Sequence, residues 1–187
     1  MADSTHGHPA IVRFTHWINT LSFLALVVSG VAILLAHPRF YWGETGVVGG
    51  PSLFDLPLPF ILTGQTGWGR YLHFLAAWVF VINGLLYVSS GIFSRAFYSR
   101  PQRITYLAVT LVLAPLTVWT GLAMSPALTS VYPSIVTVFG GQQSARTIHF
   151  FAADMLVLFL LVHITMVSLA GFTSHMRGMI TGNEPAG

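Results

Sequence analysis

The sequence contains no cysteine, no lysine and little charge of either sign. Without cysteine the chain cannot form a disulfide, bind an iron–sulfur cluster through thiolates, or attach a c-type haem through a C-x-x-C-H motif. Charged residues make up only 7% of the 187 residues, whereas hydrophobic residues make up 54%. This balance excludes an ordinary water-soluble domain and indicates an integral membrane protein.

All eight basic residues are arginine, and they exceed the acidic residues by three. We attribute this small surplus of positive charge to membrane topology and not to nucleic-acid binding. The opening segment, MADSTHGHPAIVRFTHWINT, lacks the basic region, short apolar core and small-residue cleavage site of a secretory signal. We therefore expect the first apolar stretch to be a helix of the mature protein.

Four hydrophobic stretches are long enough to cross a bilayer, whose hydrocarbon core of about 30 Å requires roughly 20 helical residues. The predicted spans are residues 11–36, 69–93, 104–125 and 144–172. The predicted fold is all-α, an integral membrane four-helix bundle over residues 11–172 with tails at 1–10 and 173–187. Pro115 should kink the third span, because proline removes a backbone hydrogen bond.

An even number of spans places both tails on one side of the membrane, here called side A. Five of the eight arginines fall on that side: Arg13, Arg95, Arg100, Arg103 and Arg177. The positive-inside rule then predicts that side A and both tails are cytoplasmic. The opposite side, side B, carries two longer connections, residues 37–68 and 126–143. They are the natural surface for an external partner.

The pattern Arg-x-x-His opens three of the four spans. Its members are Arg13 with His16, Arg70 with His73, and Arg146 with His149. A spacing of three places both side chains on one helix face, with the arginine about one turn nearer the water. A haem inserted edge-on into a bundle requires this arrangement, because the imidazole can ligate iron while the guanidinium pairs with a propionate. The pattern therefore predicts non-covalent, b-type haem.

His163 is a fourth candidate ligand, 14 residues after His149 on the same span. This interval gives roughly 21 Å of rise and only about 40° of residual rotation, so one helix can serve two stacked haems. The topology supplies a second histidine at each depth. His73 should lie level with His149 near side B, and His16 level with His163 near side A. We therefore predict two bis-histidine haems b and no catalytic residue in the chain itself.

Glycines on the ligand helices agree with this arrangement, because glycine lets a flat macrocycle approach the backbone closely. Gly30 lies 14 residues after His16, at the depth of the side-B haem. Gly84 and Gly91 lie 11 and 18 residues after His73, towards the side-A haem. Each ligand helix thus leaves room for the opposite haem.

Other interpretations of these residues stay open at this point. A single histidine in a span can serve as an interhelical hydrogen-bonding residue, and a proton relay or transporter also uses such histidines. His37 and His175, at the ends of spans, are alternative ligands. Arginine at a span end is otherwise ordinary interfacial anchoring. The transporter reading, however, requires neither the 14-residue interval nor the flanking arginines.

The sequence resembles the two-haem cytochrome b subunits of bacterial membrane oxidoreductases, the group of thiosulfate reductase, Ni–Fe hydrogenase and formate dehydrogenase. The likeness is closest to the thiosulfate-reductase type, and it is carried by RFTHWINTLSFLALVVSG, PRFYWGETG with SLFDLPLP, and IHFFAADMLVLFLLVHITMVSLAG with MRGMITG. It implies an inner-membrane anchor that passes electrons between the quinone pool and a periplasmic catalytic subunit, typically a molybdopterin enzyme. On this resemblance the axial ligands are His16, His73, His149 and His163.

We expect the chain to be the electron-transfer subunit of an oxidoreductase complex. A quinone would bind near side A through Asn19, Arg103 and His175, because side B is where a soluble partner would dock. A rival hypothesis is a self-sufficient superoxide:quinone or ferric oxidoreductase with the same two haems. A third is a haem-free transporter or membrane anchor. A visible spectrum distinguishes the third from the others, and co-purification of a molybdenum subunit distinguishes the first two.

Overall fold

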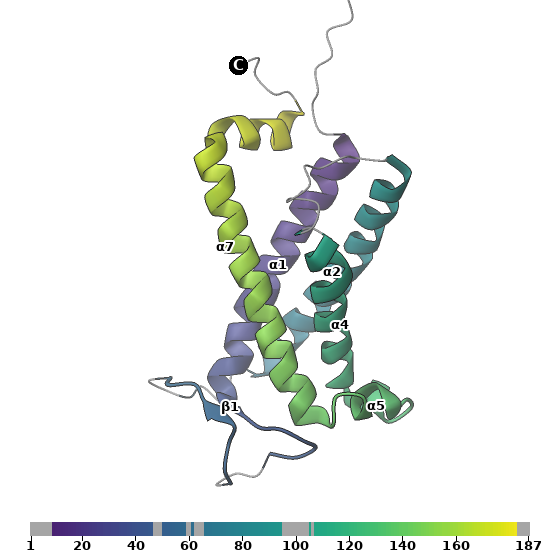
Figure 1. Cartoon of the computed structure of the whole chain (residues 1–187), viewed down its shortest axis with the longest axis vertical. Helices are drawn as coiled ribbons and strands as arrows, with labels where there is room; N and C mark the ends of the chain where they lie inside the picture. Colours follow the sequence, from purple (N-terminus) through teal and green to yellow (C-terminus); the bar gives the residue numbers. More distant parts are fainter. Residues whose placement is uncertain are drawn as a thin grey trace, which may run out of the picture.

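Long helices run between the two ends of the molecule (Figure 1). In this computed structural model residues 9–46, 50–58, 61, 66–94, 105 and 107–182 are described. Three helices in this part of the chain are long and apolar enough to cross a membrane: α1 (Ala10–Ala36), α2 (Thr66–Ser94) and α7 (Gln142–Thr181). A fourth apolar helix, Val109–Ala123, is shorter. The start of α1 and the end of α7 lie together at side A.

The third predicted span combines two kinds of helix. The π-helix η2 (Val109–Leu113) leads directly into α4 (Ala114–Ala123), in which Pro115 is the second residue. Proline lacks the N–H of a regular helical turn, and the N–H of Ala114 bonds to the carbonyl of Val109 in the π pattern. The span predicted to kink at Pro115 thus has a π-helical segment directly in front of this proline's turn.

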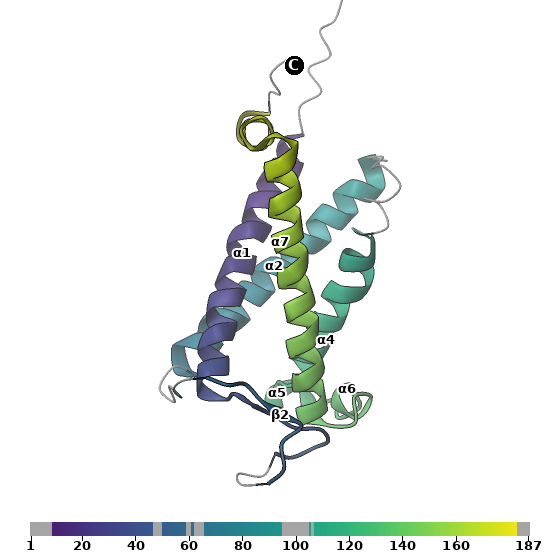
Figure 2. The ribbon, with the colours of Figure 1, turned by 60° about the vertical axis from the view of Figure 1, so that its left-hand side comes forward.

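The helices are arranged as two pairs, seen from a second direction in Figure 2. α1 packs along α2 and α4 packs along α7, whereas contact between the two pairs is sparse. Small residues allow α1 and α2 to approach closely, since a Cβ at Gly69 would lie only 3.2 Å from the Cβ of Ala32. The buried Asn83 amide of α2 donates to the carbonyl of Thr15 and to Oδ1 of Asn19, both at 2.7 Å.

The connections at side B fold against the helix ends. Two short helices, α5 (Pro126–Thr129) and α6 (Ser134–Thr137), join α4 to α7 over a small core of Ala123, Val136 and Ala145. The strands β1 (Arg39–Phe40) and β2 (Phe54–Asp55) pair antiparallel in the other connection. Phe40 is only 1% exposed, because its ring packs between Phe54 and Phe150, with centres 4.7 and 4.6 Å away.

The last predicted span, expected to end at residue 172, meets a break in α7 one residue earlier, and a further helical segment follows to Thr181. Gly171 interrupts α7 with φ 114° and ψ 77°, a conformation that glycine adopts without a Cβ penalty. After this break, residues 172–181 turn across the side-A end of the molecule (Figure 1). Trp17 Nε1 donates to the carbonyl of Met179 at 3.2 Å, and Arg13 donates to the carbonyl of Ile180 at 2.9 Å. The C-terminal segment 172–181 is thereby tied to the start of α1.

Candidate haem sites

The structure brings the four predicted ligand histidines together in two pairs. The ring centres of His73 on α2 and His149 on α7 lie 6.1 Å apart. Those of His16 on α1 and His163 on α7 lie 6.4 Å apart. These are the pairs that the topology predicts, one towards side B and one towards side A. That they ligate iron stays a prediction.

The separations within the pairs fit a metal held between two imidazoles. A ligating histidine nitrogen lies about 2.0 Å from its metal and the ring centre about 1.2 Å further back, so two axial rings should have centres about 6.3 Å apart. The observed 6.1 and 6.4 Å bracket this value. Both pairs therefore have the spacing that a bis-histidine haem requires.

Buried acceptors contact the Nδ1 atoms of the side-B pair. His73 Nδ1 lies 2.9 Å from Oγ of Ser29. His149 Nδ1 lies 2.9 Å from the carbonyl oxygen of Thr117 and 3.1 Å from Oγ1 of Thr120. Histidines that bind metals commonly donate their second ring N–H to such a group, which fixes the tautomer and orients the ring. Here Nδ1 is engaged on both rings, which leaves Nε2 for the predicted ligation.

A cavity of about 210 Å³ adjoins the side-B histidines between the helix pairs. Apart from His73, His149 and Thr117, its walls are apolar, with residues from α1, α2, α4 and α7. Glycines face both rings: a Cβ at Gly30 would lie 3.8 Å from Cε1 of His73, and one at Gly121 would lie 3.4 Å from Cε1 of His149. Gly30 is therefore at the depth predicted for it.

The other two predicted glycines lie on α2. A Cβ at Gly84 would meet no described atom within 4 Å, so there is open space beside it. Gly91 also lies in α2. Their contact with a side-A haem stays a prediction.

Aromatic rings surround the side-A pair. His16 meets Trp17 edge-on with ring centres 5.5 Å apart, and His163 stacks on Phe159 at 6.1 Å with an interplanar angle of 20°. Aromatic side chains thus pack beside both rings of the side-A pair.

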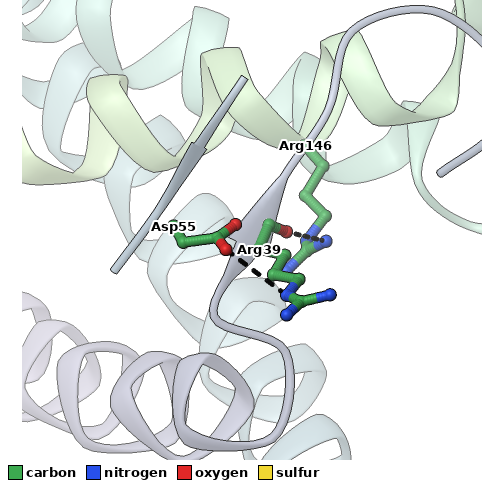
Figure 3. A network of polar contacts seen from close by, with 3 residues as sticks. All are labelled: Arg39, Asp55 and Arg146. Atoms are coloured by element: carbon green, nitrogen blue, oxygen red, sulfur yellow. Dashed lines mark hydrogen bonds and ion pairs between the residues drawn. The ribbon is translucent and has the colours of Figure 1, made fainter. Parts of the chain in front are cut away.

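Arg146 binds the side-B connection. Its guanidinium donates to the carbonyl of Arg39 at 3.0 Å and to the carbonyl of His37, and it lies 4.9 Å over the Phe40 ring. Figure 3 shows this contact beside the ion pair of Arg39 with Asp55, whose Nε and Oδ2 atoms are 3.4 Å apart. Burial lowers the pKa of His37, and the nearby positive charges of Arg146 and Arg70 lower it further. Arg146 thus fastens the loop that carries β1 to the start of α7.

The propionate role predicted for the three arginines stays a prediction. Arg13 holds the C-terminal segment 172–181, as described above, and Arg146 holds the β1 connection. Arg70 is exposed on α2. Among the described contacts, Arg13 and Arg146 donate to backbone carbonyls and Arg70 does not.

The described contacts do not join the residues predicted for a quinone. Asn19 accepts the Asn83 hydrogen bond between α1 and α2. His175 is exposed on the C-terminal segment 172–181. Arg103 lies outside the described residues. A quinone site built from these three stays a prediction without support from the described contacts.

Sequence reasoning missed Ser29, Thr117, Thr120 and Gly121, which all contact the side-B histidines. A signal for three of them was present in the third span. Thr120 and Gly121 lie three and four residues after Thr117, so the three residues share one helix face. That face is polar or small within an otherwise apolar span that has no histidine of its own.

Comparison with known proteins identifies the group to which the chain belongs. A family model described as prokaryotic cytochrome b561 matches residues 7–182. The chain belongs to this family. Membership in the cytochrome b561 family implies a membrane haem protein with b-type haem. The family model does not distinguish the thiosulfate-reductase type from other members.

One curated relative of this cytochrome b561 protein is named putative protein-methionine-sulfoxide reductase subunit YedZ1, from Azospira oryzae. The two sequences are 28% identical over an alignment of 212 positions, gaps included, and the alignment covers 94% of this chain and 96% of the relative. No solved structure matches the chain. The likeness to the relative therefore extends over the whole membrane domain.

Proposed function

We propose that this cytochrome b561 protein holds two haems b in a four-helix bundle and carries electrons between the quinone pool and a periplasmic oxidoreductase. The observation that supports the proposal is the pair of histidine separations, 6.1 and 6.4 Å, at two levels of one molecule. His149 and His163 lie 14 residues apart on α7, so the two levels are roughly 21 Å apart along that helix.

Haem bound at each level would supply one-electron redox chemistry. The chain offers two imidazoles at each level, so it leaves no coordination position for a substrate. This favours electron transfer over oxygen or substrate chemistry. The apolar walls beside His73 and His149 exclude water from the side-B level.

The partner is proposed to be a reductase that docks on side B. The relative is named as a subunit of a reductase, and we extend that role to this chain. Exposed apolar residues of the side-B connections support a docking surface there, since water-facing patches of this kind mark interaction sites. They are Trp42, Leu53, Val131, Tyr132 and Val138. The resemblance to thiosulfate-reductase-type subunits suggests a molybdopterin enzyme as this partner. In this proposal side A faces the cytoplasm of a bacterial cell.

Haem analysis of the full chain, purified from membranes, tests the proposal. Pyridine haemochrome spectra should give about two haems per chain, and acid acetone should extract them because no cysteine binds them covalently. Addition of a quinol should reduce both. A value near one haem would contradict the two-level arrangement, and a colourless protein would favour the transporter or anchor hypothesis.

The partner is tested by purification under mild conditions from the native membrane. A co-purifying periplasmic oxidoreductase subunit, reduced in a quinol-dependent manner, is the expected result. Quinone-coupled superoxide or ferric turnover by the isolated chain would instead favour the self-sufficient oxidoreductase.

A further inference from the structure

The same small motif occurs on two helices and faces the two side-B histidines. On α1 it is Ser29 followed by Gly30, and on α4 it is Thr120 followed by Gly121. Both hydroxyl residues are fully buried, at 0% exposure. Ser29 contacts His73 of the neighbouring α2, and Thr120 contacts His149 of the neighbouring α7. Each helix pair thus contains one hydroxyl–glycine motif and one histidine.

The glycines complete the contact. A Cβ at Gly30 would lie 3.8 Å from Cε1 of His73, and one at Gly121 would lie 3.4 Å from Cε1 of His149. In both cases the hydroxyl meets Nδ1 while the glycine backbone adjoins the next ring atom. The imidazole lies against the facing helix, an approach that a larger side chain would obstruct.

The hydroxyl hydrogens are already used within their own helices. Ser29 Oγ donates to the carbonyl of Ala25 at 2.7 Å, with Leu26 at 3.1 Å. Thr120 Oγ1 donates to the carbonyl of Leu116 at 2.8 Å, with Thr117 at 3.0 Å. A hydroxyl has one hydrogen and two lone pairs, so an oxygen whose hydrogen stays on its own helix can only accept from the imidazole. His149 carries its proton on Nδ1, because the Thr117 carbonyl beside that atom can only accept, and His73 does the same when the Ser29 hydrogen stays on the Ala25 carbonyl.

The carbonyl three residues before each hydroxyl takes part as well. The carbonyl of Thr117 lies 2.9 Å from His149 Nδ1, and on α1 the corresponding carbonyl of Leu26 lies 3.1 Å from Oγ of Ser29. The repeated arrangement is therefore a carbonyl at position i−3, a hydroxyl at i and a glycine at i+1. Its repetition around both rings of one pair indicates a common role.

We infer that Ser29 and Thr120 are positioning residues that hold His73 and His149 as Nδ1–H tautomers and keep the side-B haem at a lower potential than it would otherwise have. The inference rests on the proposed haem function. An Nδ1–H bond to a buried acceptor raises the basicity of a metal-binding imidazole. A more basic axial ligand stabilises ferric over ferrous iron, and the aromatic surroundings of His163 provide no equivalent contact among the described residues.

Redox titration of the haem-loaded protein, followed in the α-band, is the test. Ser29→Ala and Thr120→Val remove a hydroxyl while leaving the carbonyls in place. Each should raise the midpoint potential of the side-B haem. The ratio of oxidised to reduced side-B haem at a fixed potential should fall three- to tenfold, which corresponds to a rise of about 30 to 60 mV at 59 mV per tenfold. The side-A haem should not change.

Two control variants separate a hydrogen-bonding role from packing. Ser22 lies seven residues before Ser29 on α1, is also buried, and donates to the carbonyl of Ile18 at 2.8 Å. Its contacts do not include a histidine ring among the described residues, so Ser22→Ala should leave both potentials unchanged. Thr120→Ser keeps the hydroxyl and should keep the wild-type side-B potential.

The outcomes distinguish this inference from the proposed function. The wild-type protein is first shown to bind two haems, since absence of haem would refute the proposed function and not the positioning role. With two haems bound, unchanged side-B potentials in Ser29→Ala and Thr120→Val would overturn the inference. Loss of the side-B haem from Thr120→Val but not from Thr120→Ser would support it. Loss from both would show a packing role and overturn it.

Discussion

Substitution of Gly121 tests whether the His149 ring lies against α4 when haem is bound. A Cβ at this position would lie 3.4 Å from Cε1 and 3.7 Å from Nδ1 of His149. Gly121→Ala therefore reaches ordinary contact distance and should keep both haems. Gly121→Leu places further carbon atoms where the ring lies, so His149 must move.

The size of the effect follows from the cost of overpacking. Forcing extra methylene groups into a packed site costs about 1–3 kcal/mol, which corresponds to about 5- to 150-fold in a binding equilibrium. Gly121→Leu should therefore weaken binding of the side-B haem by about 5- to 150-fold and leave the side-A haem bound. Haem content should fall from two towards one per chain, with loss of the spectral component that His149→Ala removes.

Gly67 provides a matched control near the start of α2, because a Cβ there meets no described atom within 4 Å. Gly67→Leu should retain two haems. Two haems and a wild-type spectrum in Gly121→Leu would refute the placement of the His149 ring against Gly121. Equal haem loss in Gly67→Leu would show that the assay reports general instability.

Three further predictions concern the ligands and the arginines. His149→Ala and His16→Ala should remove different components in a redox titration, because their rings belong to different pairs; loss of the same component would contradict the pairing. Arg70→Gln should lower the midpoint potential of the side-B haem, since a nearby positive charge favours the reduced iron, and an unchanged potential with full haem content would favour lipid anchoring. Arg13→Leu removes the hydrogen bond to the carbonyl of Ile180, so limited proteolysis should cut the C-terminal segment 172–181 faster than in the wild type; an unchanged rate would show that this contact contributes little.

Helix length and periodicity made the main elements and the histidine pairs predictable. α1 begins one residue from its predicted start, because a long apolar run has few other ways to satisfy its backbone in a membrane. The depth of each histidine follows from its distance to a helix end at 1.5 Å per residue. Once the direction of each span is known, the pairing of His73 with His149 and of His16 with His163 follows.

The contacts across helices could not be predicted, because they depend on how each helix is rotated about its axis. Asn19 is polar and near side A, which suggested a quinone ligand, yet its side chain is used by Asn83 of α2. Ser29 resembles any back-bonded serine in a span until His73 is placed beside it. At Gly171 the sequence permits a positive φ but does not require one, so the span was predicted to end at residue 172 but the helical segment after the break was not predicted.

The sparse contact between the two helix pairs has a consequence for biogenesis. Each proposed site draws one imidazole from the α1–α2 pair and one from α7, so cofactor insertion would join two halves that otherwise touch little. The α1–α2 hairpin leaves the ribosome first, and Asn83 and Gly69 already join its two helices. The second pair would then be joined to this hairpin mainly through the haems and less through side-chain packing.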